Sequence, residues 1–444
     1  MSARRSRKQR LPETPVAATV ESLSHDGRGV ARVEGKTVFI DGALAGEEVR
    51  FRYRSRRRSF DEGEVEQVLR PSPLRVTPKC PHFGVCGGCS LQHMAGERQI
   101  EFKQQILLDN LQRLGGVSPE EVLPPLRGPR WRYRRRARLS VKYVRKKGRV
   151  LVGFRERHSP YVAELQQCDV LHPAVGLRIE SLRELIGGLH AYDRIAQIEV
   201  AVADNAAALV FRNLDELQAA DIERLRQFGR DQELHIYLQP GGPDSVFALY
   251  PSDSELSYRV AGAEVELQFR PTDFVQINAA VNDAMVTRAL DLLQLGGSER
   301  VLDLFCGIGN FSLPMARRAT QVVGVEGDRE LVDRATGNAR RNGLANVEFH
   351  VANLAEDAAR HAWAREQFQR VLLDPPRAGA LEVLPQVAAT APDRIVYVSC
   401  HPGTLARDAG QLVQRHGYRL ACAGVMDMFP HTAHVESIAL FVRR

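Results

Sequence analysis

Hydrophobic and polar positions follow two different patterns along the chain, and the change comes near residue 275. Over 14–69, short runs of β-branched residues alternate with Gly and Asp turn signals, which predicts a small β-barrel, a fold widely used to bind oligonucleotides. Apolar residues on roughly one side predict a helix over 96–114. Residues 130–270 predict a mixture of strands and helices, with helices near 174–187 and 214–228.

From about residue 275 onward, short apolar runs alternate with helical patterns. This alternation predicts a doubly wound α/β domain with a mainly parallel sheet, Rossmann-like in architecture. A helix over 328–343 closes at Gly343, and further helices lie between the other strands. The predicted strands cover 300–306, 321–326, 346–353, 370–376, 394–400 and the last segment, 437–444.

The chain of 444 residues is long enough for several domains. We predict four segments: a basic disordered arm at 1–13, the barrel at 14–70, a central α+β domain at 78–270 and the α/β domain at 271–444. A short transit peptide is the alternative for the arm. Since no apolar run reaches the length of a membrane span and no secretory signal is visible, we expect a cytoplasmic protein without a membrane partner.

Positive charge is concentrated in two stretches of a chain whose net charge is +7. Residues 50–58 hold six arginines, and residues 130–157 hold 13 Lys or Arg against one acidic residue, with aromatic residues between them. A solvated face is the simpler explanation of a charge run. Dense charge mixed with flat rings favours a nucleic acid, because the cations neutralise phosphates and the rings stack on unpaired bases.

Polar or reactive residues follow all five predicted parallel strands, where ligands bind in such sheets. Gly307 and Gly309 let a ligand approach the backbone, but Ser312 stands where a dinucleotide fingerprint needs a third glycine. A carboxylate at Glu326 can accept both hydroxyls of a ribose, although a tight turn with a helix cap is the plain alternative. The residues at these exits are Asp303–Asn310, Glu326, Asn353, Asp374 with Pro375 and Pro376, and Ser399 with Cys400.

Seven cysteines, without an export signal, favour thiol or metal chemistry in a reducing compartment over disulfides. Three of them form the C-x5-C-x2-C pattern of "CPHFGVCGGC", at Cys80, Cys86 and Cys89. A metal site needs a fourth ligand, for which Cys168 is the remaining cysteine outside the α/β domain and His82 and His93 are competitors. Thiolates alone do not separate zinc from iron–sulfur.

Five segments resemble the RNA uridine C5-methyltransferases, a class I S-adenosylmethionine-dependent family. They are "VLDLFCGIGNFSLPMA", "VVGVE", "LLDPPRAG", "YVSCHPGTLARD" and "HVESIALF", all within 270–444. The cysteine pattern and the barrel extend the resemblance to the branch that acts on 23S ribosomal RNA, whose barrel is a TRAM domain. The tRNA-specific relatives lack both features.

The resemblance implies a function and roles for named residues. The chain would form 5-methyluridine in 23S rRNA, with no stable protein partner implied. Cys400 would add to C6 of the uracil, and Glu436 would remove the C5 proton. A [4Fe-4S] cluster on Cys80, Cys86, Cys89 and Cys168 would act as a staple that shapes an RNA-binding surface. S-adenosylmethionine would be held by Gln276, Phe305, Asn310, Glu326, Asn353 and Asp374.

Simpler explanations exist for the two catalytic candidates. A free cysteine is often only buried, and Glu436 could pair with an arginine. Cys306 and Cys422 are rival thiols that we expect to be packing residues. We expect some stabilisation of a thiolate at Cys400, but not from His401, whose side chain should point to the other face of the strand.

Other functions remain open on the sequence. An RNA-binding factor with an inert methyltransferase domain, an N-methyltransferase with a similar Asp-Pro-Pro segment, and a tRNA-specific enzyme are the alternatives. The target base must leave its stack to reach the thiol, so an extruded uridine is expected. Arg138 and Phe274 lie in segments that could hold it.

Overall fold

The computed structural model describes residues 11–356 and 361–444, so most of the predicted basic arm at 1–13 lies outside the described residues. Contacts divide the chain into two compact units. The first contains the described residues up to Phe102 together with His431–His434, and the second contains Lys103–Pro430 and Val435–Arg444. The four segments predicted from the sequence stay a prediction in their boundaries.

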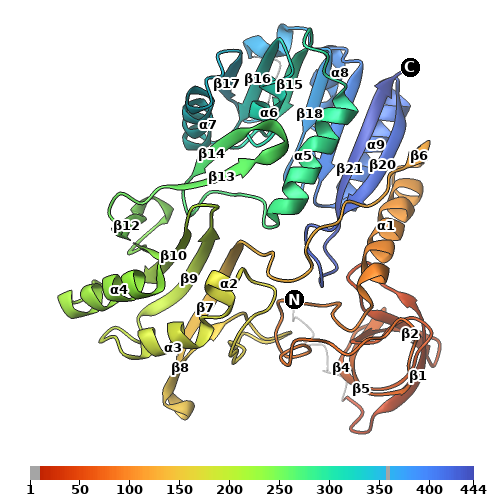
Figure 1. Cartoon of the computed structure of the whole chain (residues 1–444). Helices are drawn as coiled ribbons and strands as arrows, with labels where there is room; N and C mark the ends of the chain where they lie inside the picture. The colour runs from red at the N-terminus through yellow and green to blue at the C-terminus, as the bar shows by residue number, and fades with distance from the viewer. Residues whose placement is uncertain (1–10, 357–360) are drawn as a thin grey trace, which may run out of the picture. The chain divides into compact units, whose positions relative to one another are not determined.

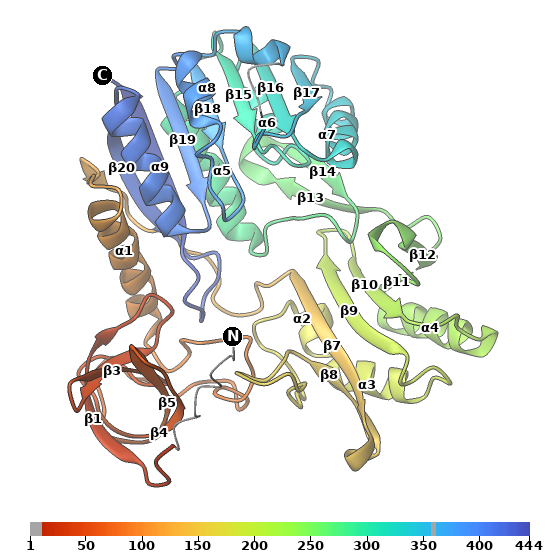
Figure 2. The ribbon, with the colours of Figure 1, turned by 180° about the vertical axis from the view of Figure 1, so that it is seen from behind.

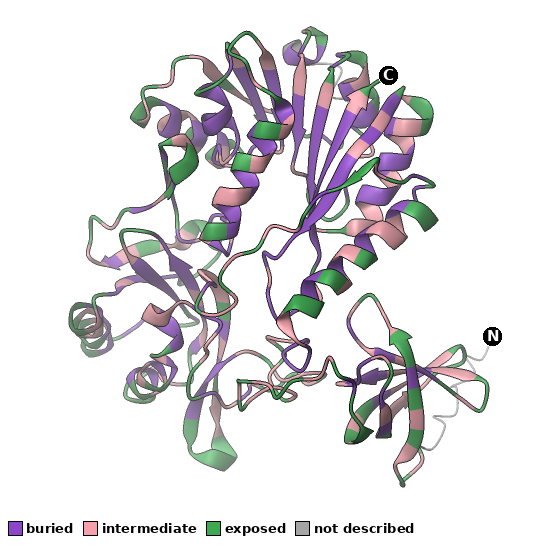
Figure 3. Cartoon of the chain, turned by 45° about the vertical axis from the view of Figure 1, so that its right-hand side comes forward, coloured by how far each residue is buried: buried purple, intermediate pink, exposed green. Residues whose placement is uncertain are grey.

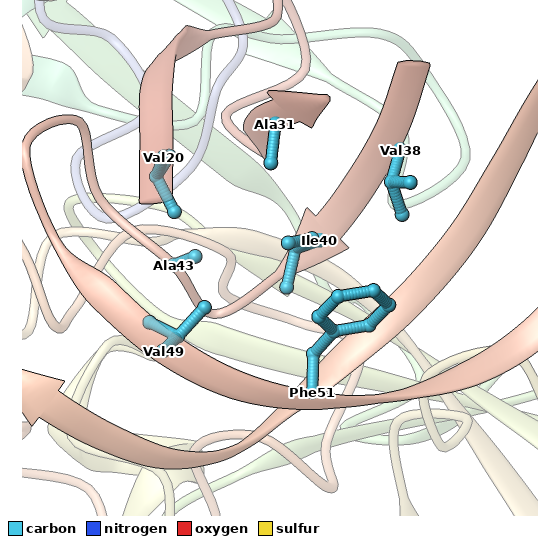
Figure 4. Packing of buried hydrophobic residues seen from close by; sticks show 7 residues of the cluster. All are labelled: Val20, Ala31, Val38, Ile40, Ala43, Val49 and Phe51. Carbon is cyan, nitrogen blue, oxygen red and sulfur yellow. The ribbon is translucent and has the colours of Figure 1, made fainter. Parts of the chain in front are cut away.

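The first unit contains the predicted barrel. Five strands close in the order β1-β2-β3-β5-β4, with β4 pairing back onto β1. Inward-facing apolar side chains fill the interior, as expected for a small barrel (Figure 4). The strands are β1 (Val16–Leu23), β2 (Gly29–Val33), β3 (Lys36–Asp41), β4 (Glu48–Arg56) and β5 (Phe60–Arg70).

Phe51 is the largest side chain of this core and needs a glycine opposite it. A Cβ atom on Gly63 would lie 2.4 Å from Cδ2 of Phe51 and 2.9 Å from the carbonyl oxygen of Arg52. The missing side chain therefore provides the space that the ring fills.

The loop between β5 and α1 is tied to the barrel through one buried carboxylate. Glu47 accepts hydrogen bonds from the backbone N–H of Leu44 at 2.7 Å, the N–H of Ser72 at 3.2 Å and the guanidinium of Arg75 at 2.7 Å. These bonds compensate its burial, and the pKa of Glu47 is lowered although burial alone raises it. Helix α1 (Gly96–Arg113) follows and ends one residue before its predicted end.

The second unit begins with a six-stranded sheet in the order β12-β11-β10-β9-β7-β8. A two-stranded ribbon, β13-β14, follows it. The strands are β7 (Arg136–Val144), β8 (Arg149–Gly153), β9 (Ile195–Val202), β10 (Ala207–Asn213), β11 (His235–Leu238), β12 (Phe247–Tyr250), β13 (Leu256–Val260) and β14 (Val265–Phe269). The helices are α2 (Pro173–Gly176), α3 (Ile179–Gly187) and α4 (Ala219–Gln232), with short 3-10 turns at Arg145–Lys147, Pro243–Ser245 and Ala261–Ala263.

Two predicted helices of this region differ from the observed ones. The helix predicted at 174–187 is broken into α2 and α3, because Arg178 leaves the helical region with φ −111° and ψ 12°. The helix predicted at 214–228 begins only at Ala219. Asp215 is held before it by an ion pair with Arg194 and by a hydrogen bond from the Asn213 amide to its carbonyl oxygen at 3.0 Å.

An eight-stranded sheet forms the rest of the second unit, in the order β17-β16-β15-β18-β19-β21-β20-β6. Its strands are β15 (Arg300–Leu304), β16 (Gln321–Glu326), β17 (Val347–Val351), β18 (Arg370–Leu373), β19 (Arg394–Ser399), β20 (Tyr418–Met426), β21 (Glu436–Arg443) and the short β6 (Glu121–Val122). The helices are α5 (Ala279–Leu293), α6 (Ser312–Ala316), α7 (Arg329–Arg341), α8 (Leu384–Ala389) and α9 (Pro402–Arg415), with a 3-10 turn at Ala362–Arg365.

The predicted doubly wound α/β fold is confirmed. Strands β17, β16, β15, β18 and β19 are parallel, whereas β21 is antiparallel to both of its neighbours, β19 and β20. Helix α5 covers one face of this sheet, and α9 covers the other (Figures 1 and 2). The central strands are buried almost throughout (Figure 3). The first strand ends at Leu304 rather than at 306, because Phe305 adopts φ +67°.

No helix within 11–356 or 361–444 has both the length and the apolar character needed to cross a membrane.

We predict that Phe51→Ala opens the barrel locally. Phe51 is 0% exposed, and removal of a buried phenylalanine costs about 3–5 kcal/mol. Hydrogen-exchange mass spectrometry should show faster exchange in peptides from β1–β5. Leu69→Ala is the matched control, because Leu69 is 44% exposed on β5 and should leave the exchange unchanged. Equal protection in the two variants would contradict the packing described here.

Candidate active site at the carboxyl edge of the sheet

The parallel strands bring several of the predicted site residues to one edge. Since β15, β16, β18 and β19 run in the same direction, their carboxyl ends lie together. Phe305, Glu326, Asp374 and Cys400 stand at or directly after these ends. Asn353 follows β17 at the side of the sheet, two residues after Val351.

The turn after β15 leaves room for a ligand at one glycine. Gly307 has φ +54°, and a Cβ atom added there would meet no atom within 4 Å. Gly309 has φ +95°, and a Cβ atom there would lie 2.3 Å from Cδ1 of Leu313. The first glycine therefore borders open space, and the second is required by the packing of the turn.

Glu326 ties strand β16 to this turn. Its Oε2 atom accepts a hydrogen bond from the N–H of Gly307 at 3.1 Å. Its Oε1 atom accepts from the N–H groups of Gly327 at 2.7 Å and Asp328 at 3.2 Å. These bonds fix the carboxylate, and Oε2 keeps a further lone pair for a ligand hydroxyl.

The side chain of Asn310 anchors the same turn to two other elements. Asn310 and Asn282 exchange two hydrogen bonds of 3.0 Å, and the hydroxyl of Tyr258 donates to Oδ1 of Asn310 at 3.0 Å. Asn282 and Tyr258 were not predicted from the sequence. A buried asparagine in the apolar helix α5 is the signal that could have indicated the first of them.

Asn353 is exposed and takes part in local hydrogen bonds. Its amide donates to Oε1 of Glu356 at 2.9 Å, and its Oδ1 accepts from the N–H of Ala355 at 3.1 Å. The side chain is therefore positioned at the end of β17 without being buried.

The segment 270–278 carries Gln276 and Phe274 and is bound to the basic strand β7. The N–H of Arg135 donates to the carbonyl oxygen of Ile277 at 2.9 Å, and the guanidinium of Arg136 donates to Pro271. Gln276 is half-buried, whereas Phe274 is 74% exposed. These bonds thus connect a basic strand of the six-stranded sheet to the segment that precedes helix α5 of the α/β domain.

Arg138 lies on β7 opposite Glu199 of β9 and forms an ion pair of 2.8 Å with it. The two side chains meet at the surface, where such pairs contribute little to stability. Arg138 is therefore held in place without being removed from solvent.

The strand ladder brings Cys400 and Glu436 to the same end of the sheet. Strands β19 and β21 are antiparallel, and their pairing ends with Ser399 and Ser437. Cys400 directly follows β19 and Glu436 is the first residue of β21, and the charge of Glu436 acts on the Cys400 thiol. Glu436 is 9% exposed, and Cys400 is half-buried.

Burial and mutual repulsion raise the pKa values of these groups. Burial raises the pKa of Asp374 to about 7. Burial, with the charge of Asp374, raises the pKa of Glu436 to about 8, against the opposing effect of Lys103 and Arg377. The pKa of the Cys400 thiol is raised by burial, by Glu436 and by Asp374, and only Arg377 among the nearby charges lowers it.

The expectation of a stabilised thiolate at Cys400 is therefore wrong. Burial and the nearby acids Glu436 and Asp374 raise the pKa of the sulfur, so the neutral thiol is favoured. The ring of His401 does not compensate, because its Nδ1 atom accepts the N–H of Thr404 at 3.2 Å and caps helix α9.

The rival thiols are both buried, as expected of packing residues. Burial raises the pKa of Cys306 well above its usual value and that of Cys422 to about 11. Cys306 stands next to a further buried acid, Asp303, whose pKa is raised to about 8 and whose carboxyl group accepts the hydroxyl of Ser312. Asp303 is fully buried, and the sequence analysis gave it no role.

The predicted metal ligands are distributed over the two units. Cys80, Cys86 and Cys89 lie in the loop between β5 and α1, and Cys168 lies between β8 and α2. Within the part of the chain that the structure describes, no group of three or more His, Cys, Asp or Glu side chains is arranged as a metal site. The [4Fe-4S] cluster stays a prediction.

Comparisons with known proteins agree with the fold and identify the family. The model of the tRNA (uracil-5-)-methyltransferase family matches residues 127–444, and that of the TRAM domain matches residues 14–52. The crystal structure of Pyrococcus abyssi tRNA (uracil-54, C5)-methyltransferase in complex with S-adenosyl-L-homocysteine superimposes with a TM-score of 0.73 at 24% identity. It covers 96% of this chain and 99% of its own, and it supports the fold.

Two curated relatives are much more similar in sequence. The 23S rRNA (uracil(1939)-C(5))-methyltransferase RlmD of Alkalilimnicola ehrlichii is 58% identical over 438 residues, covering 98% of each chain. The protein of the same name from Nitrosococcus oceani is 54% identical over 441 residues, covering 99% of this chain and 98% of its own. The chain therefore belongs to the tRNA (uracil-5-)-methyltransferase family.

Proposed function

We propose that this chain transfers a methyl group from S-adenosylmethionine to C5 of a uridine in 23S rRNA, through a covalent bond between Cys400 and the uracil ring. The observation that carries the proposal is that the antiparallel pairing of β19 with β21 brings Cys400 and Glu436 to the edge of the sheet where Glu326 stands. The curated relatives named as 23S rRNA methyltransferases support rRNA over tRNA as the substrate, and the barrel that matches the TRAM domain suits an RNA of either kind.

The turn after β15 and the end of β16 suit the nucleoside part of S-adenosylmethionine. Glu326 would accept the ribose hydroxyls, and the open space beside Gly307 would admit the ligand close to the backbone. Gln276, Phe305, Asn310, Asn353 and Asp374 are the other proposed binding residues, with Asn310 acting through the network that orients the turn. When bound, S-adenosylmethionine supplies an electrophilic methyl group on a sulfonium.

Cys400 would activate the uracil ring by nucleophilic addition. The thiol loses its proton to solvent, the sulfur of the resulting thiolate forms a bond to C6, and the electrons of the C5–C6 double bond move toward O4, which makes C5 electron-rich. C5 then forms a bond to the methyl carbon, whose bond to the sulfonium breaks. A carbon that was a poor nucleophile in free uracil becomes reactive only while it is attached to the enzyme.

Glu436 would complete the reaction as the general base. Its carboxylate removes the C5 proton, the C5–C6 double bond forms again, and the bond between C6 and the Cys400 sulfur breaks with release of the thiolate. A carboxyl group with a pKa of about 8 suits this transfer, because it holds the proton strongly once it has accepted it.

Two features suit an RNA substrate. The basic segments 50–58 and 130–157 would neutralise phosphates, with Arg138 among their exposed cations. Phe274 is an exposed aromatic side chain two residues from the proposed ligand Gln276, and it would stack on an extruded base.

The four cysteines outside the α/β domain would bind a [4Fe-4S] cluster as a structural element. Cys80, Cys86, Cys89 and Cys168 are all partly exposed, unlike the buried Cys306 and Cys422. The N–H of Gly88 donates to the sulfur of Cys86 at 3.4 Å, which is the kind of bond that tunes cluster-bound sulfur. Methyl transfer moves no electrons in net terms, so the cluster would shape the surface that meets the RNA.

We expect an RNA fragment with 5-fluorouridine at the target position to trap the covalent complex. Fluorine at C5 cannot leave as a proton, so Glu436 has nothing to remove after methyl transfer. Intact-mass spectrometry with S-adenosylmethionine should show protein, RNA and one methyl group joined together.

Cys400→Ala should form no such complex, whereas Cys422→Ala, which removes a buried thiol of the same sheet, should form it. Glu436→Gln should accumulate the complex even on unmodified RNA. RNA that binds without forming an adduct in the unaltered protein would refute Cys400 as the nucleophile.

Glu326→Gln should weaken the binding of S-adenosylhomocysteine. Loss of a charged hydrogen-bond acceptor costs about 1.5–3 kcal/mol, or roughly a factor of 10 to 150 in affinity. Isothermal titration calorimetry measures this directly. Glu348→Gln, on the exposed side of β17, is the control and should bind as the unaltered protein does. Equal affinities in both variants would exclude Glu326 from the binding site.

Anaerobically purified protein should contain about four iron and four sulfide ions per chain. Cys89→Ser should lose them and bind RNA less tightly, while binding of S-adenosylhomocysteine stays unchanged. Metal analysis, visible absorption and salt-dependent RNA binding give the three readouts. Zinc in place of iron would refute the cluster, and unchanged RNA affinity and folding after iron removal would refute its structural role.

A further inference from the structure

Lys103 of helix α1 is a fully buried lysine close to the proposed active site. Its side chain is 0% exposed. Its Nζ atom donates hydrogen bonds to Oδ1 of Asp427 at 2.8 Å and to the carbonyl oxygen of Phe429 at 2.9 Å. A lysine is rarely buried without a partner, because the ammonium loses its hydration, and burial lowers the pKa of Lys103 while Asp427 opposes that shift.

The backbone connects this ion pair to Glu436. Asp427 directly follows Met426, the last residue of β20, and Met426 pairs with Glu436 of β21. The ammonium is therefore held at the end of the β20–β21 ladder at which Glu436 stands. Its charge acts on Glu436 and lowers the pKa of that carboxyl group.

Charged and titratable groups from four other segments also face Glu436. Asp374, after β18, repels the carboxylate, and Arg377 in the following loop attracts it. Cys400 follows β19, and the charge of Glu436 raises the pKa of its thiol. Asp427 holds Lys103 in place. Arg377 is exposed, so water and salt screen its charge, whereas Lys103 acts through the protein interior. Lys103 is thus the cation whose effect on Glu436 is least screened.

We propose that Lys103 is a positioning residue for the general base: its buried ammonium, fixed by Asp427 and the Phe429 carbonyl, increases the fraction of Glu436 that is ionised near neutral pH and can accept the C5 proton. The inference rests on the proposed function, because it assigns Lys103 to one step of that reaction. Removal of the charge would decrease that ionised fraction. Cys400 addition and methyl transfer would still occur, and release of the product would slow.

The test compares Lys103→Met with Lys103→Arg on unmodified RNA in single turnovers. Lys103→Met removes the charge with similar volume, and Lys103→Arg keeps it. The double variant Lys103→Met/Asp427→Asn removes both charges, so that no buried carboxylate is left unpaired if the single variant fails to fold. Rapid quenching in denaturant measures the methylated covalent complex and the released product over a range of pH, and a thermal melt reports folding.

We expect the variants without the charge to accumulate the methylated complex at neutral pH. The rate of product release should still rise with pH, but the rise should occur about one pH unit higher than in the unaltered protein. Below that pH, release should be roughly tenfold slower. Above that pH, the release rate should recover. Lys103→Arg should show the same pH dependence of product release as the unaltered protein.

Two results would overturn the inference. In the first, the variants without the charge release product with the same pH dependence as the unaltered protein. In the second, they form less complex and less product to the same extent at every pH, as expected of a purely structural ion pair. Either result leaves the proposed function intact if the unaltered protein still forms the complex and Glu436→Gln still accumulates it. Absence of any complex in the unaltered protein would instead refute the proposed function.

Discussion

The antiparallel pairing of β21 with β19 is the constraint on which the site depends. A parallel sheet gathers only carboxyl ends at its ligand edge, so a residue at the start of a strand would normally lie at the opposite edge. Because β21 runs against β19, its first residue, Glu436, stands at the ligand edge. Strand β20 is antiparallel to β21 and therefore runs in the same direction as β19, so its carboxyl end and Asp427 also lie at this edge.

Burial at this edge raises the pKa values of the acids and of the thiol. Asp303, Asp374, Glu436 and Cys400 all have raised pKa values, because each loses hydration and most of them repel a neighbour. Such an arrangement favours neutral groups that exchange protons near neutral pH. Lys103 is a buried cation at the same edge, and its charge lowers the pKa of one of these acids, Glu436.

Polar networks hold the cofactor turn in place from several directions. Glu326 receives three backbone N–H groups, and Asn310 is joined to α5 and to the β13–β14 ribbon through Asn282 and Tyr258. A ligand placed on this turn would therefore meet groups whose orientation is already fixed. Preorganised groups of this kind lose little entropy on binding.

The sequence by itself determined the elements and the reactive residue types. Turn signals and alternation predicted the barrel, and the β–α alternation with polar strand exits predicted the α/β fold and its ligand edge, because both patterns are local along the chain. Some predicted boundaries of helices and strands differed from the structure. Examples are the break between α2 and α3, the late start of α4, and the early end of β15 at Phe305.

Only the tertiary structure decided the environment of the reactive groups. The raised pKa of the Cys400 thiol, the network around Asn310 and the burial of Lys103 beside Asp427 depend on residues separated by tens to hundreds of positions. No periodicity encodes such contacts, and burial changes the charge state of a side chain without changing the sequence around it. The sequence therefore specified which groups were available, and packing specified how they are charged and which of them meet.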